Sequence, residues 1–205
     1  MRFANLVAFL PLLFPAAQAL TAPIDGYEVS EPEWELEVLP GKTIIVNGTF
    51  EDAYEEALKH NPNFHEEYTE PHYKRQLRQL ELTKRFNQQQ EEWGLTSMYC
   101  GDRPDWLAVD VNIARKVIND VMRFSGKPIR GPGWANCERV RCHNTGALWW
   151  CNDAPNTREL PGYTTLTRGA NFILASCVRT GFGEGHSTKG QAFHRDNWNV
   201  IVRKC

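Results

Sequence analysis

The chain has 205 residues, a net charge of −2 and a hydrophobic fraction of 41%, which suits one domain with a modest core and some additional segments. Beyond the first nineteen residues, no stretch approaches the roughly 20 consecutive apolar residues that a membrane-spanning helix needs. The composition therefore argues against a transmembrane helix downstream of the N-terminus.

Residues 1–19 have the pattern of a secretory signal peptide. Arg2 supplies a positive charge, an apolar run covers residues 6–14, and a small-x-small cleavage site ends at Ala19. The alternative, an N-terminal core helix, is disfavoured because the apolar run is short. We expect cleavage after Ala19 and an extracellular, secreted protein.

Residues 20–85 form an acidic, cysteine-free region that we interpret as a pro-segment or an N-terminal extension. From residue 23 to residue 85 there are fourteen acids and seven bases, a net of −7, whereas residues 86–205 have eleven acids and fifteen bases, a net of +4. The pair Lys84-Arg85 lies at this change of charge, where a kexin-like protease would remove a pro-segment. The alternative is a solvated charged face. A glycosylation sequon begins at Asn47.

Hydrophobic periodicity and capping residues predict the elements in chain order. The expected order is a strand at 42–46, helices at 49–57, 71–93 and 105–124, a hairpin at 137–151, a helix at 164–178, a glycine-rich loop at 180–189 and a strand at 197–205. Residues 86–205 then form a cysteine-rich α+β domain, a small disulfide-stapled sandwich with two helices packed on one face of an antiparallel sheet.

The six cysteines all lie after residue 99, and their even number in a secreted chain predicts three disulfides. No closely spaced C-x-x-C pair indicates zinc, and we expect neither a metal nor a cofactor. Sequence alone leaves fifteen pairings open. Hairpin geometry favours Cys137 with Cys151, and a core-facing Cys142 would reach Cys177 on the second helix. Cys100 and Cys205 then remain, and joining them would tie both ends of the domain.

The hairpin is the most informative stretch. A three-residue turn would place Cys137 opposite Cys151 and Arg139 opposite Trp149, which gives one basic and aromatic face. Val140, Cys142 and Leu148 would share the other, core-facing side, although a one-residue slip would exchange the two faces.

Three phrases, GPGWANCERVRC, ALWWCND and the closing GQAFHRDNWNVIVRKC, resemble a group of small secreted fungal proteins near the Ecp-type effectors and the killer-toxin-like sandwich proteins. The resemblance covers residues 100–205. It implies an extracellular, disulfide-bonded α/β sandwich that acts as an effector or necrosis factor, and it implies no catalytic residue.

Catalytic motifs are sparse. There is no G-x-S-x-G elbow, and the glycines at 181–185 lack the lysine of a phosphate loop. A ribonuclease needs a general acid and base plus an arginine for phosphate charge, which His194 with Asp196, Glu138 and Arg139 could supply. This hydrolase is the alternative function, because the same residues can serve as ordinary hydrogen-bonding groups.

The stronger hypothesis is a binding surface made of Arg139, Arg141 and Trp149, because interfaces favour arginine and tryptophan. A basic face would attract an acidic extracellular target of a host or competitor, or an anionic membrane surface, and we expect no nucleic-acid partner. The alternative is that the tryptophans are core residues. The sequence thus predicts a secreted effector or toxin-like protein that acts by binding.

Overall fold

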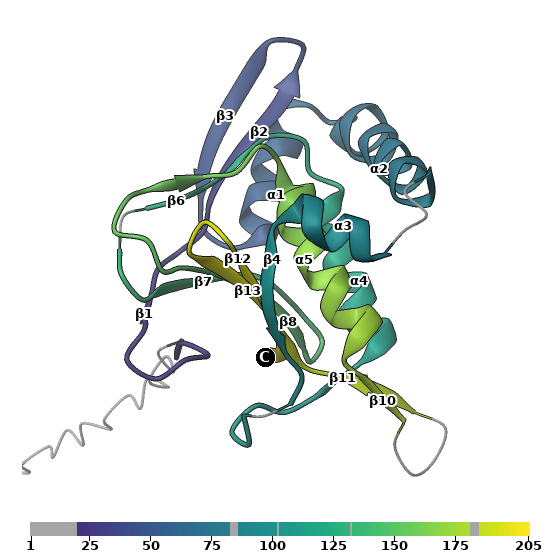
Figure 1. Ribbon diagram of the computed structural model, residues 1–205. Coiled ribbons are helices and arrows are strands. Elements are labelled where there is room, and N and C mark those ends of the chain that lie inside the picture. The colour runs from purple at the N-terminus through teal and green to yellow at the C-terminus, as the bar shows by residue number, and fades with distance from the viewer. Residues whose placement is uncertain (1–19, 83–85, 102, 132, 181–184) are drawn as a thin grey trace, which may run out of the picture.

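The computed structural model describes residues 20–82, 86–101, 103–131, 133–180 and 185–205, and these residues form a mixed α+β structure (Figure 1). The predicted signal peptide and the pair Lys84-Arg85 lie outside the described residues. The described helices are α1 (Phe50–His60), the π-helix η1 (His65–Thr69), α2 (Glu70–Leu82), α3 (Phe86–Trp93), α4 (Val111–Met122) and α5 (Tyr163–Ser176).

The strands within the described ranges form three sheets, of six, three and four strands. The six-stranded sheet has the order β1 (Glu28–Val29), β7 (Asn136–His143), β8 (Gly146–Asn152), β13 (Trp198–Lys204), β12 (Gly190–His194) and β4 (Leu95–Tyr99). The three-stranded sheet contains β10 (Val178–Thr180), β11 (His186–Thr188) and β5 (Val109–Asp110). The four-stranded sheet contains β3 (Lys42–Asn47), β2 (Glu33–Leu39), β6 (Pro128–Arg130) and β9 (Arg158–Glu159).

Helices α4 and α5 pack against each other and against strands of the six-stranded sheet (Figure 1). Helix α4 begins later than the sequence predicts. The Asp110 carboxylate accepts hydrogen bonds from the backbone N–H groups of Asn112 (2.8 Å) and Ile113 (3.2 Å), and this cap fixes the helix start. Residues 105–107 are not helical, and Trp106 among them is buried.

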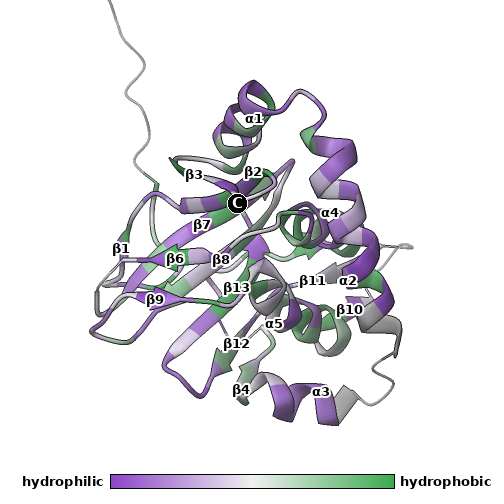
Figure 2. Ribbon diagram, turned by 90° about the horizontal axis from the view of Figure 1, so that it is seen from above, coloured by the Kyte–Doolittle hydropathy of each residue, from purple (hydrophilic) through white to green (hydrophobic). Residues whose placement is uncertain are grey.

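The acidic region is part of the main hydrophobic core. Trp34, Leu36 and Val38 of β2 are fully buried, and the Trp34 ring lies 5.4 Å from both Phe124 and Tyr163 in the cysteine-rich part. Helix α1 covers the same core, and the predicted cap at Thr49 is present. By contrast, α2 and α3 are mostly hydrophilic (Figure 2).

A second, smaller core lies on the other face of the six-stranded sheet. It contains Trp149, Ile201 and the Cys137–Cys151 disulfide, covered by Trp106 and Ile24. The Trp106 indole N–H donates to the Pro23 carbonyl at 2.6 Å, which holds the start of the acidic region against the loop before α4. Both faces of the sheet are therefore covered in its central part.

The β7–β8 hairpin pairs Cys137 with Cys151 as predicted, but the turn and the register that bring them together differ from the prediction. His143 pairs with Gly146, so the turn has two residues and the expected three-residue turn is wrong. A β-bulge at Val140 compensates for the difference, because one extra residue on β7 shifts the register.

That bulge also explains why two predicted disulfides are wrong. The structure has Cys137–Cys151, Cys142–Cys205 and Cys100–Cys177. Past the bulge, Cys142 pairs with Ala147 of the smaller core, so it faces away from the helices and cannot reach Cys177. It meets Cys205, where β13 ends alongside the hairpin turn.

Candidate functional site

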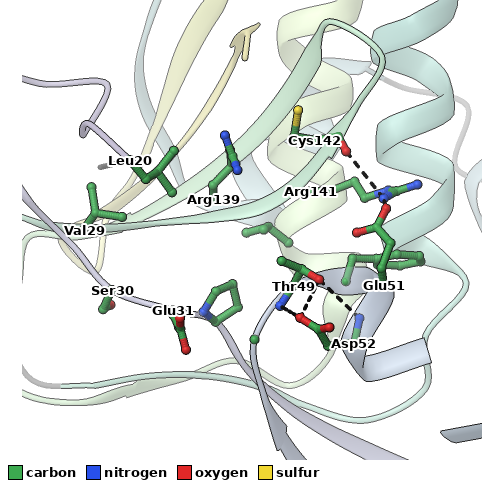
Figure 3. A pocket seen from close by; sticks show the side chains of 14 residues that line it. Leu20, Val29, Ser30, Glu31, Thr49, Glu51, Asp52, Arg139, Arg141 and Cys142 are labelled. Atoms are coloured by element: carbon green, nitrogen blue, oxygen red, sulfur yellow. Dashed lines mark hydrogen bonds and ion pairs between the residues drawn. The ribbon is translucent and has the colours of Figure 1, made fainter. Parts of the chain in front are cut away.

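A cleft of about 540 Å³ opens at the outer edge of β7 (Figure 3). Its walls are Leu20 with residues 29–32 on one side and residues 48–52 on the other, and its floor is residues 139–142 of β7. We call this the β7 cleft. The β7 cleft lies between the acidic region and the cysteine-rich part. Two of the three residues of the predicted binding surface, Arg139 and Arg141, line it.

Arg139 is the free cation of the β7 cleft. It lies opposite Trp149 in the ladder, as the sequence predicts, and it is half-buried. Burial lowers the pKa of its guanidinium, which nevertheless stays charged at neutral pH. Among the described residues, no hydrogen-bond acceptor or carboxylate engages this guanidinium.

Arg141 is instead fully engaged. Its guanidinium forms ion pairs with Glu51 and with Asp120, the latter at 3.2 Å, and lies over the Phe50 ring at 4.5 Å. Only 7% of the residue is exposed, because the bulge turns it toward α4. Arg141 therefore serves to join the acidic region to the domain rather than to bind a partner.

Trp149 is not part of the exposed surface. It is 3% exposed and lies in the smaller core, while Trp150 and Trp198 lie in the main core. The expectation of an exposed aromatic at this position is wrong, because Ile24 of the acidic region and Trp106 of the loop before α4 cover that face of the sheet.

A second cleft, of about 400 Å³, lies between α1, η1, α2 and α4, and we call it the helical cleft. The Tyr54 hydroxyl and Nδ1 of His65 are 3.1 Å apart, and Nε2 of His65 is 3.6 Å from Glu70. Glu70 pairs with Arg123, whose guanidinium lies over Tyr73 at 4.1 Å. Acid–base groups and an arginine thus meet across the two parts of the chain.

The electrostatics of the helical cleft reflect its partial burial. Burial, together with Glu66 and Glu70, raises the pKa of Tyr54, so this hydroxyl keeps its proton at neutral pH. Lys116 pairs with Asp120 at 3.0 Å on the α4 side. Both carboxylates in the lining of the helical cleft, Glu70 and Asp120, are therefore paired with a base.

The predicted catalytic set does not assemble. The His194 ring stacks on Trp198 at 4.4 Å and meets Trp93 edge-on at 5.0 Å, while Asp196 lies 3.6 Å from its Nδ1. Glu138 is buried elsewhere, 3.7 Å from Arg130, with both side chains 3% exposed. Burial lowers the pKa of His194 and raises that of Glu138 to about 8.

The helical cleft was missed at the sequence level because no short motif connects its members. His65 and Glu70 are close in the chain, but Arg123 reaches them only through the packing of α2 on α4.

Among the described residues, no group of three or more His, Cys, Asp or Glu side chains could hold a metal ion. None of the described helices is long and apolar enough to cross a membrane.

The exposed Asn47, the first residue of the glycosylation sequon, lies at the end of β3, where its side chain is accessible.

No protein-family model, curated protein or solved structure matches the chain. Three disulfides are compatible with an extracellular protein.

Proposed function

We propose that the protein is a secreted effector or toxin-like protein that acts by binding an extracellular target at the β7 cleft. One observation carries this proposal: Arg139 lines the cleft without an ion-pair partner among the described residues, whereas Arg141 beside it is paired twice. A half-buried arginine without an internal partner is suited to a partner's carboxylate, because the guanidinium presents a planar set of donors.

The resemblance of residues 100–205 to small secreted fungal proteins supports the effector or toxin-like role, and three disulfides support an extracellular location. The target is a molecule of a host or competitor outside the producing cell. A membrane surface is a weaker match, because Arg139 lies in a cleft beside the acidic residues Glu31, Glu51 and Asp52. Anionic lipid is attracted by clusters of exposed bases instead.

The test compares Arg139→Glu with Arg115→Glu, a matched charge reversal on the exposed face of α4. Purified wild-type protein and both variants are mixed with plant and yeast cells, and the cell-bound fraction is measured as a function of concentration. We expect Arg139→Glu to weaken binding at least about fivefold, equivalent to about 1 kcal/mol, and Arg115→Glu to bind as wild type. Equal binding by all three proteins would refute the assignment of the target site to the β7 cleft.

A second candidate function is a secreted hydrolase of ribonuclease type, and the helical cleft favours it. His65 with Glu70 could exchange protons with a phosphodiester, and Arg123 could balance phosphate charge. The test is RNA cleavage by wild type, His65→Gln and His194→Gln. This candidate predicts cleavage by wild type and His194→Gln and a loss of about 100-fold or more in His65→Gln. Absence of cleavage by the wild-type protein would eliminate it.

A further inference from the structure

Among the described strands, none pairs with the outer edge of β7 along most of its length. β1 pairs with β7 in parallel only at Asn136 and Cys137, and the strand continues for six more residues to His143. After Ser30 the chain turns away toward Pro32 and β2. Within the described ranges, no strand lies outside residues 138–143, so the β7 cleft opens onto a free sheet edge.

The main chain of Arg139 faces that edge. Ser30 N–H donates to the Cys137 carbonyl at 3.1 Å, so the main-chain groups of Cys137 point outward toward β1. Successive residues of a strand alternate, and Arg139, two residues further, therefore points its N–H and C=O the same way. In the described part of the chain, neither Ser30 nor a later residue forms a backbone hydrogen bond with Arg139 on this side.

Charge limits what can occupy the edge. Glu51 is held by Arg141, and the Asp52 carboxylate accepts hydrogen bonds from Thr49, at 2.8 Å from its N–H and 2.7 Å from its hydroxyl. Arg139 is thus the cation available to an incoming side chain. An occupant with a single carboxylate complements it, whereas a run of acids would be repelled by the carboxylates of the opposite wall.

We propose that the β7 cleft binds an extended peptide segment of the extracellular target, which adds as a strand to β7 beyond the end of β1 and places one carboxylate against Arg139. Main-chain hydrogen bonds at Arg139 supply affinity, and the guanidinium selects the acidic residue. The bulge at Val140 disrupts regular pairing, so the added strand is short. This inference rests on the proposed function and specifies its ligand class.

The test uses the full secreted chain and three blocked heptapeptides of alternating threonine and valine. The first has a central aspartate, the second has lysine in its place, and the third keeps the aspartate but carries N-methyl groups on the amides beside it. Affinity is measured by titration, and amide hydrogen exchange is followed at Arg139 by NMR. The Arg139→Gln variant is measured in parallel.

We expect the aspartate peptide to bind and to slow exchange of the Arg139 amide about tenfold or more at saturation, because a new hydrogen bond protects it. The lysine peptide should bind about fivefold more weakly, and Arg139→Gln should abolish this difference. N-methylation should weaken binding to a similar degree, since it removes main-chain donors.

Equal affinity for the aspartate and N-methylated peptides would overturn strand addition while leaving the cleft as a binding site. Failure of all three peptides to bind, with Arg139→Glu still impaired on cells, would likewise overturn the inference but not the proposed function. Equal cell binding by Arg139→Glu and wild type would overturn both.

Discussion

Replacing Trp34 tests whether the acidic region belongs to the cooperative core. Trp34 is 1% exposed, and its ring contacts Phe50, Phe124 and Tyr163 at centroid distances of 5.4–5.8 Å. Its indole N–H also donates to the Gly48 carbonyl at 3.0 Å. One side chain from the acidic region thus fills space between α1 and the cysteine-rich part.

The expected magnitude follows from burial and packing. Removing a buried tryptophan to alanine costs about 3–5 kcal/mol, because apolar contact is lost and a cavity remains. Trp34→Phe keeps a ring but loses the hydrogen bond and part of the volume, so we expect about 1–2 kcal/mol. Trp134→Ala is the matched control, since Trp134 is 75% exposed and should change stability by about 0.5 kcal/mol or less.

Urea unfolding followed by circular dichroism measures these differences. With a slope of about 2 kcal/mol/M, Trp34→Ala should lower the urea midpoint by about 1.5–2.5 M. The order should be Trp34→Ala, then Trp34→Phe, then Trp134→Ala close to wild type. If Trp34→Ala shifted the midpoint no more than Trp134→Ala, residues 20–82 would not share a core with the rest of the chain.

Two further predictions concern pH and processing. Burial raises the pKa of Glu138 to about 8, so the folded chain binds this proton more tightly than the unfolded chain, and the resulting stabilisation is full below pH 4.5 and is lost as pH rises through 8. Glu138→Gln should remove this component, and a pH-independent difference from wild type in urea unfolding between pH 5 and 9 would contradict the assignment. Cleavage at Lys84-Arg85 should give two fragments that co-elute on native gel filtration, because residues 20–82 share the main core, yet separate on a denaturing gel without reductant. Separation under native conditions would show that the shared core does not hold them together.

Local signals in the sequence account for part of the fold. Apolar periodicity predicts α5 and the last strand within a residue or two, and Thr49 predicts the start of α1. Strand β2 was missed even though Trp34, Leu36 and Val38 alternate strictly with glutamates, the pattern of a strand with one buried face. Three of the seven residues of β2 are glutamates, so the acidic composition of the segment conceals its buried face.

The candidate sites were only partly predictable, because they depend on contacts between distant segments. Arg139 could be identified as a surface cation of the hairpin. Arg141 nearby, however, forms ion pairs with Glu51 and Asp120, which come from two other elements. The charge difference between the two parts of the chain indicated a boundary, yet it also describes complementary partners, as Glu70 and Arg123 illustrate. A one-dimensional pattern cannot distinguish these meanings.

The bulge at Val140 has a consequence for comparing related chains. Cross-strand partners in a regular hairpin with a two-residue turn are always separated by an odd number of positions, whereas Cys137 and Cys151 are separated by 14. An even spacing of bonded cysteines across such a turn therefore requires one extra residue on one strand. The parity of the cysteine spacing is thus a criterion for aligning related chains. A chain with the same turn but an odd spacing would have a regular ladder. The residue at the position of Arg139, counted back from the turn, would then face the opposite side of its sheet.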